Sequence, residues 1–192
     1  MKTLNLRLAL AAGVALTAAI GLTAADRPAL AALLAPGPAA TAAPTEAGDD
    51  GRPVIGLQYD GPIKVVYQVS DDEWKDDVGK GLLYLGKLRD YYEKQGVPAE
   101  RLDIRAVYHG EAAAHLLTDE AWRKYGFEGE ANPNTAVISK LTERGVTVEL
   151  CNARRQREGW AKNEIHPDVQ LAQAAYARLI DLQHQGYAYI RF

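Results

Sequence analysis

The chain has 192 residues, of which 47% are hydrophobic and 24% are charged, with a formal net charge of −3 at pH 7. This length suits one domain with a well-buried core, and the mildly acidic balance argues against nucleic acid or an anionic membrane as a partner. The only cysteine is Cys151, which excludes an intramolecular disulfide and a cysteine-rich zinc site.

The N-terminus has the pattern of a secretory signal peptide. Lys2 and Arg7 precede an apolar run from Leu8 to Leu22, and three small residues, 23–25, follow it. No arginine pair precedes the run and no cysteine follows it, so residues 1–25 predict Sec-type export to a bacterial periplasm. The alternative is an uncleaved anchor, but the run is short for a span of about 20 residues. We therefore expect cleavage, after which no stable membrane span remains.

Residues 26–55 are expected to form a flexible spacer. Alanine and proline dominate the segment up to about residue 50, and it lacks aromatic residues that would anchor it to a core. The folded domain is therefore expected to comprise residues 56–192.

The first half of this domain reads as strand, helix and strand. Residues 63–69 are β-branched and aromatic, which is typical of a buried strand. The acidic residues 71–73 predict the start of a helix over residues 74–95, whose apolar positions recur every three or four residues. Residues 102–108 predict a second strand, and His109 begins the turn after it.

The second half continues the alternation. We expect a short helix over 111–117, a helix started by the Asn-Pro-Asn of residues 132–134, a third strand over 146–150 ending at Cys151, a short strand over 169–171, a helix over 173–185 and a last strand over 187–192. Helices between strands require crossover connections. The sequence therefore predicts an α/β fold: a doubly wound, mostly parallel five-stranded sheet with helices on both faces, of flavodoxin-like size.

Several polar residues follow the predicted strands directly. Ligands of open parallel sheets lie beyond the carboxyl ends of the strands, near the point where the strand order reverses. If the order is 2-1-3-4-5, strands two and three flank strand one at that point. Asp71, His109 and Cys151 then meet at one edge of the sheet.

Cys151 is the candidate nucleophile. It precedes a polar turn, residues 152–159, that is able to open a short helix, and free backbone amides and nearby guanidinium groups favour thiolate over thiol. Asn152, Arg154 and Arg155, together with Asp71, are the candidate binding residues. The alternatives are a buried, inert cysteine and a solvated arginine loop.

The other chemistry-bearing signals are weaker. His109 is a candidate for proton transfer or a turn-forming histidine. His109, His115 and Cys151 match no established metal-ligand spacing, so no metal is predicted, although a site built on His109 and His115 is a third alternative. Phosphate-binding glycine loops and a serine-nucleophile elbow are missing, and we expect no flavin, nucleotide or other cofactor.

Five segments in order resemble the DsrE/DsrF-like family: KVVYQVSDD, AVYHG, the helix started by NPN, VTVELC and LQHQGYAYI. The resemblance is to the exported, stand-alone members and covers residues 63–192. It implies a parallel α/β sheet, homo- or hetero-oligomers, and a sulfur relay in which a cysteine at the end of strand three carries sulfane sulfur as a persulfide. For this chain we expect a homo-oligomer. Cys151 matches that cysteine. Many exported relatives follow it with Gly-Gln, whereas this chain has Asn152-Ala153.

Two functions follow as hypotheses. The first is a periplasmic sulfur carrier of the sulfurtransferase type, which exchanges sulfur with donor and acceptor proteins or small thiols, with Arg154 and Arg155 favouring the anion and His109 assisting proton transfer. The second is a non-catalytic oligomeric module, a scaffold or small-molecule binder in which Cys151 is structural. Its pocket would be lined by Tyr67, Trp74, Tyr108 and Trp160.

Overall fold

The computed structural model of the protein describes residues 46–191, which belong to one compact unit. The predicted signal peptide, residues 1–25, lies outside the described residues. Of the predicted spacer, only residues 46–55 are described, and they contain a short antiparallel pair, β1 (Glu46–Ala47) with β2 (Pro53–Val54). None of the helices within residues 46–191 is both long and apolar enough to cross a membrane.

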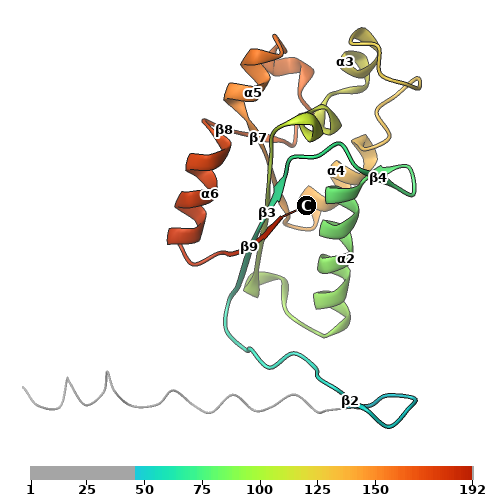
Figure 1. The fold of residues 1–192 in the computed structure, drawn as a ribbon, viewed down its shortest axis with the longest axis vertical. Helices are drawn as coiled ribbons and strands as arrows, with labels where there is room; N and C mark the ends of the chain where they lie inside the picture. Colours follow the sequence, from blue (N-terminus) through green and yellow to red (C-terminus); the bar gives the residue numbers. More distant parts are fainter. Residues whose placement is uncertain (1–45, 192) are drawn as a thin grey trace, which may run out of the picture. The chain divides into compact units, whose positions relative to one another are not determined.

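The centre of the domain is a five-stranded parallel sheet (Figure 1), as the sequence predicts. Its strands are β3 (Ile63–Val69), β6 (Leu102–Tyr108), β7 (Thr147–Cys151), β8 (Gln170–Ala172) and β9 (Ala188–Arg191). Every neighbouring pair is parallel. The two longest strands match their predicted bounds, because their β-branched and aromatic residues are buried on both faces of the sheet.

The strand order differs from the expected 2-1-3-4-5. The observed order is β8-β7-β6-β3-β9. The first four strands of this sheet, β3, β6, β7 and β8, therefore lie next to one another in chain order, and the fifth, β9, pairs with the free side of β3. Each of the first three crossovers places its strand next to the preceding one, which is the commonest arrangement of consecutive elements. The order therefore reverses between β3 and β9, and strands two and three do not flank strand one.

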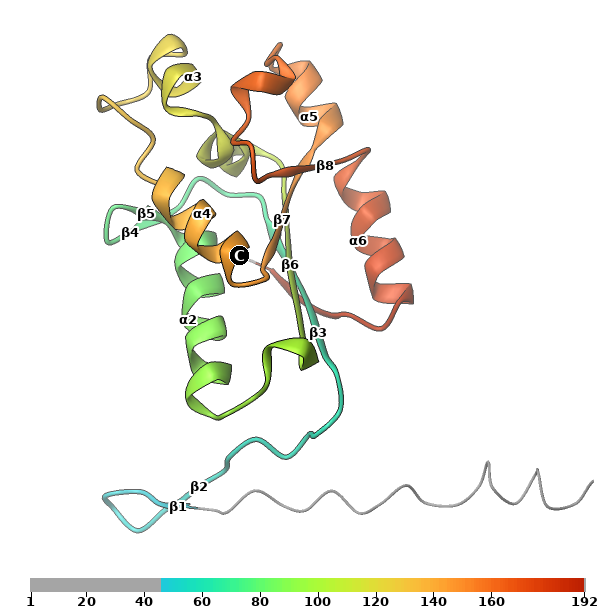
Figure 2. The same ribbon diagram turned by 180° about the vertical axis from the view of Figure 1, so that it is seen from behind.

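Helices cover both faces of the sheet (Figure 2). On one face α2 (Lys80–Lys94) and α4 (Thr135–Glu143) bury Leu82, Leu85 and Ile138 in the larger apolar cluster. On the other face α6 (Ala175–His184) buries Leu179 and Leu182 in a smaller one. Because the side chains of a strand alternate between the two faces, each central strand contributes residues to both apolar clusters. This burial on both faces explains why the strands are continuous apolar runs.

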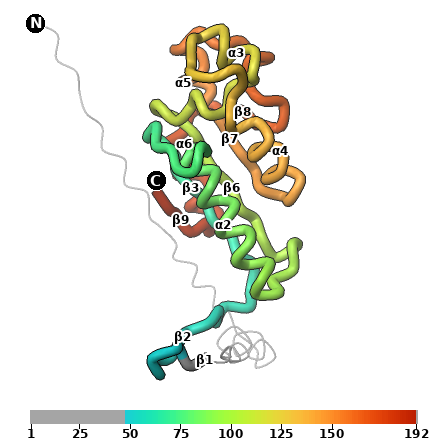
Figure 3. Tube along the Cα trace, turned by 90° about the vertical axis from the view of Figure 1, so that its right-hand side faces the viewer, coloured from blue at the N-terminus to red at the C-terminus, as the bar shows by residue number. Residues whose placement is uncertain are grey.

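Short helices gather beyond the carboxyl ends of the strands. They are η3 (Glu111–Leu116), α3 (Asp119–Lys124), α5 (Asn152–Arg157) and η4 (Lys162–Glu164), while η2 (Ala99–Arg101) precedes β6 at the opposite end. Figure 3 shows α3 and α5 at the same end of the sheet. The short helices predicted over 111–117 and after Cys151 are thereby confirmed.

The predicted helix start at residues 71–73 is wrong. Residues 74–79 form a hairpin of β4 (Trp74–Lys75) and β5 (Val78–Gly79), and α2 begins only at Lys80. Asp76 and Asp77 both adopt positive φ, which is the backbone of the tight two-residue hairpin turn. Aspartate tolerates this conformation better than most residues do, so Asp76 and Asp77 favour a turn where the sequence predicted a helix.

The Asn-Pro-Asn segment acts differently from a helix cap. Asn134 precedes α4, but its Oδ1 accepts a hydrogen bond from the backbone N–H of Gly79 at 2.8 Å instead of capping its own helix. Asn132 donates from Nδ2 to the carbonyls of His115 and Leu117, at 2.9 and 2.7 Å. Both asparagines are buried, so they join α4 to the hairpin and to η3.

Two glycines of α2 allow a matched test of this packing. A Cβ at Gly81 would lie 2.7 Å from Tyr108 Oη and 2.7 Å from a methyl group of Val69, whereas a Cβ at Gly86 would meet only Leu141, at 3.9 Å. We expect Gly81→Ala to lower the free energy of unfolding by about 1–3 kcal/mol through overpacking. Gly86→Ala should raise it by about 0.5–1 kcal/mol, because alanine favours the helix. Urea denaturation of both variants checks the pair, and equal shifts would contradict the packing described.

Candidate functional site

The predicted site residues do meet at one edge of the sheet. β7 runs through Cys151, which pairs with Ala172 of β8. Tyr108, the last residue of β6, pairs with Leu150 of β7, and His109 and Cys151 are the residues that directly follow this pair. Asp71 lies two residues after β3. Since parallel strands end at a common edge, Asp71, His109 and Cys151 lie at the same edge of the sheet in the observed strand order as well.

Cys151 is a buried side chain, with 7% of its surface exposed. It belongs to the smaller apolar cluster, with Val66 and Val107 of the sheet and Ala175 and Leu179 of α6. It is also the residue immediately before α5. The thiol therefore lies beneath α6, at the carboxyl edge of the sheet.

His109 lies half-buried at the same edge. Its Nε2 is 2.8 Å from Gln68 Nε2, and Gln68 Oε1 accepts a hydrogen bond from Tyr189. The amide nitrogen of Gln68 is therefore the donor, which leaves the proton of a neutral His109 on Nδ1. The ring of Tyr176 from α6 lies edge-on, with its centroid 5.2 Å away.

Burial keeps His109 neutral at pH 7. Burial lowers its pKa below the ordinary value. Asp71 raises the pKa, and Arg191 and Arg154 lower it. A neutral imidazole is able to accept a proton, and here it would do so on Nε2 in exchange for the hydrogen bond from Gln68.

The arginines after Cys151 have different environments. Arg155 is buried and donates from Nε to Asn152 Oδ1 at 2.8 Å, and from its guanidinium to the carbonyl of Trp160. Asn152 and Arg155 therefore hold the turn after α5 together. Arg154 forms an ion pair of 2.9 Å with Glu158 and lines a neighbouring cavity.

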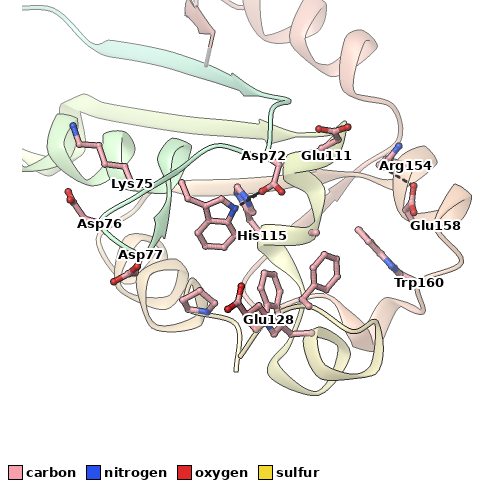
Figure 4. Close-up of a pocket in the computed structure, with 15 residues that line it drawn as sticks. Asp72, Lys75, Asp76, Asp77, Glu111, His115, Glu128, Arg154, Glu158 and Trp160 are labelled. Atoms are coloured by element: carbon pink, nitrogen blue, oxygen red, sulfur yellow. Dashed lines mark hydrogen bonds and ion pairs between the residues drawn. The ribbon is translucent and has the colours of Figure 1, made fainter. Parts of the chain in front are cut away.

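That cavity has a volume of about 840 Å³ and lies at the same end of the domain (Figure 4). Its lining residues come from the β4–β5 hairpin, η3, α3 and α5: Asp72, Trp74, Lys75, Asp76, Asp77, Glu111, Ala114, His115, Trp122, Phe127, Glu128, Pro133, Arg154, Glu158 and Trp160. Trp74 and Trp160 are two of the four aromatic residues proposed for a pocket from the sequence. Tyr67 and Tyr108 belong to the core instead.

A hydrogen-bonded group shapes the inner wall of the cavity. Asp72 Oδ1 accepts from Trp74 Nε1 at 2.6 Å and lies 2.7 Å from His115 Nε2. A carboxylate only accepts, so His115 carries its proton on Nε2. Burial lowers the pKa of His115, although the hydrogen bond and charge of Asp72 raise it. The sequence places Asp72 beside Asp71 at the sheet edge, but its bonds to Trp74 and His115 were not predicted, because residues 71–73 were assigned to a helix start.

His109 and His115 do not come together. His109 contacts Tyr176 of α6, whereas His115 packs against Trp74 and Tyr108, in the direction of α2. Among residues 46–191, no group of three or more histidine, cysteine, aspartate or glutamate side chains is arranged to hold a metal ion. The third alternative, a metal site on the two histidines, therefore lacks a geometric basis.

The histidines predict how stability depends on pH. Burial lowers the pKa values of His109, His115 and His166. Below the unfolded value of about 6.5, the unfolded chain binds more protons than the folded protein. The free energy of unfolding that these neutral histidines contribute should therefore be fully present above about pH 6.5. It should fall as the pH drops from there towards the folded pKa values. Urea denaturation between about pH 7.5 and pH 5 checks this, and a flat or rising stability would contradict it.

Comparisons with known proteins agree with the fold. The sequence matches the model of the DsrE/DsrF-like family over residues 85–192, more than half of the chain. No curated protein matches it. The solved structure of MTH1491, a protein of unknown function from Methanobacterium thermoautotrophicum, covers 68% of this chain and 99% of its own, with 19% identity and a TM-score of 0.51. The ychN protein from E. coli covers 68% of this chain and 100% of its own, with 16% identity and a TM-score of 0.48. At such identities the first likeness concerns the fold alone.

Proposed function

Because the chain belongs to the DsrE/DsrF-like family, we propose that it is a sulfur carrier that holds sulfane sulfur as a persulfide on Cys151. The observation that supports this most is the position of the thiol. Cys151 ends β7 at the carboxyl edge of a parallel sheet, and His109 directly follows the last residue of the neighbouring strand β6.

The proposed chemistry is thiol exchange. The Cys151 thiolate attacks the terminal sulfane sulfur of a donor, whose S–S bond breaks, and the donor leaves as a thiolate. A thiol of an acceptor protein or small molecule then takes up the same sulfur. His109 would take up the proton of the Cys151 thiol on Nε2 after that atom gives up the hydrogen bond from Gln68. Arg154, which affects the pKa of His109, would stabilise the persulfide anion. This scheme uses neither metal nor cofactor.

The burial of Cys151 supports a second candidate, the binding or scaffold module with a structural cysteine. With only 7% of its surface exposed, and with apolar neighbours from α6, the thiol resembles a small core residue. Reaction with a sulfur donor would then require a local opening of the contacts between Cys151 and α6.

Thiol alkylation separates the two candidates. A sulfur carrier should react with iodoacetamide in the native state, more slowly than a free thiol because of its burial, and pre-treatment with polysulfide should change the product. A structural cysteine should react only after the protein is unfolded in guanidinium. Mass spectrometry of the alkylated protein, native and unfolded, measures both rates.

We also propose that the protein acts in the periplasm, delivered by the signal peptide of residues 1–25. Fractionation of cells that produce the full-length chain tests this proposal. The expected product is a periplasmic protein whose mass corresponds to cleavage near Ala25. A full-length protein in the membrane fraction would instead indicate the uncleaved anchor.

We further propose that the protein forms a homo-oligomer through α6 and β9. Tyr176 and Ile180 of α6 are exposed by 67% and 56%, and Tyr189 and Ile190 lie exposed on the edge strand β9. Exposed apolar residues beside an unpaired strand edge are typical of association surfaces. Light scattering should therefore give a multiple of the monomer mass, and Ile180→Glu should lower it. An unchanged mass in this variant would contradict the proposed surface.

A further inference from the structure

The cavity beyond the carboxyl ends of the strands has rigid aromatic walls. Trp74 and Trp122 stand at 70° to each other with ring centroids 6.0 Å apart, and Phe127 stacks on Trp122 at 4.5 Å. Trp122 Nε1 donates to the carbonyl of Glu128 at 2.8 Å, and Trp74 is held by its bond to Asp72. Trp74 nevertheless leaves 39% of its surface exposed. Hydrogen bonds therefore orient the rings of Trp74 and Trp122, and the ring of Trp74 remains accessible to a ligand.

The charged groups around these rings are mainly acidic. Six carboxylates line the cavity, against two basic side chains. Arg154 is already paired with Glu158 at 2.9 Å, and the Lys75 ammonium lies near the ring of Tyr84, 5.9 Å from its centroid. His115 is neutral at pH 7, since burial lowers its pKa. The field in the cavity therefore favours a cation.

Aromatic faces and carboxylates together define a class of ligand. The electron-rich face of a tryptophan attracts an ammonium group, and cages of such rings are the usual receptors for quaternary ammonium groups. The volume of about 840 Å³ is ordinary for a small-molecule site. We propose that this cavity binds a small organic cation, an amine or quaternary ammonium compound with an apolar body.

This site does not include the thiol, although Arg154 both lines the cavity and affects the pKa of His109. Cys151 is not among the residues that line the cavity; it packs beneath α6 with Val107 and Leu179. The inference therefore goes beyond the proposed sulfur relay, and its failure would leave that proposal unchanged. It also gives the binding-module candidate a specific ligand class.

Titration of the full domain with choline and with butylamine tests the proposal. Binding is measured by the change in tryptophan fluorescence and by calorimetry. Dimethylbutanol, the uncharged carbon isostere of choline, is the matched ligand control. At least one of the two cations should bind saturably, and more weakly as salt is added. The isostere should bind several-fold more weakly, because it lacks the charge that rings and carboxylates attract. Failure of both cations to bind, or equal binding of choline and the isostere, would overturn the proposal.

Two variants place the binding in the cavity. Trp74→Leu removes the exposed ring, and Glu111→Gln removes one charge from an exposed side chain without changing its size. Each should weaken binding by about threefold or more. Tyr59→Leu and Asp60→Asn, which change an exposed aromatic and an exposed acid outside the cavity, should leave it unchanged. Unaltered affinity in both cavity variants would overturn the assignment, and Glu111→Gln keeps the test valid if Trp74→Leu fails to fold.

Discussion

Replacing Cys151 by serine is expected to abolish the transfer of sulfur from polysulfide to a small thiol acceptor. The hydroxyl group of serine does not form a persulfide, and Cys151 is the only cysteine of the chain, so no other thiol is able to replace it. The measurement is the rate of acceptor persulfide formation with each protein, corrected for the reaction without protein.

Thermal unfolding of the serine variant is the control, since a hydroxyl group in an apolar cluster is unfavourable. The comparison should be made at a temperature where both proteins are folded. Transfer at the wild-type rate by folded Cys151→Ser protein would exclude the proposed carrier role.

Replacing Arg178 by methionine is expected to cost about 3 kcal/mol of unfolding free energy. Glu149 lies on β7, two residues before Cys151, and is only 3% exposed. Arg178 of α6 binds both of its carboxylate oxygens, at 2.7 and 2.9 Å, while Arg105 lies farther away, at 3.5 Å. The substitution leaves a buried carboxylate without its main partner, which is the costly way to break a buried ion pair.

The double variant Glu149→Gln/Arg178→Met is the matched control. It removes the charge together with its partner and should recover a large part of the loss. Urea denaturation of the two single variants and the double variant completes the cycle. A loss below about 0.5 kcal/mol in Arg178→Met would show that this pair does not fasten α6 over the cysteine.

The strands were predictable from the sequence because their signal is local. Residues 63–69 and 102–108 are continuous apolar runs, and the observed β3 and β6 have the predicted bounds. Helices between strands then required a parallel sheet, which fixed where Asp71, His109 and Cys151 meet. The position of the thiol at the sheet edge followed from topology alone.

The errors come from features that local signals do not contain. The strand order depends on which neighbour each crossover selects, and the assumed order placed β6 and β7 on either side of β3. The hairpin at residues 74–79 is fixed by a contact 55 residues away, from Asn134 to Gly79. The helix start at residues 132–134 was predicted correctly, although the Asn134 side chain bonds to Gly79 and does not cap α4. The acidic run at 71–73 was wrongly read as a helix start, because Asp72 bonds to Trp74 and His115.

Parts of the candidate site also could not be predicted from the sequence. Arg155 looked like a ligand for an anion, yet it is buried and bonded to Asn152 and Trp160. The cavity is assembled from four separate segments, so no spacing in the sequence indicates it. The edge-on contact of Trp122 with Trp74 and its stacking on Phe127 exist only in the folded chain.

The most direct test of the proposed carrier is the intact mass of the mature protein before and after incubation with polysulfide. We expect a gain of one sulfur atom or a small multiple, located on Cys151 by peptide mapping and removed by reductant. An unchanged mass, with the thiol protected in the native state and reactive after unfolding, would contradict the sulfur-carrier account and leave Cys151 as a structural residue of the core.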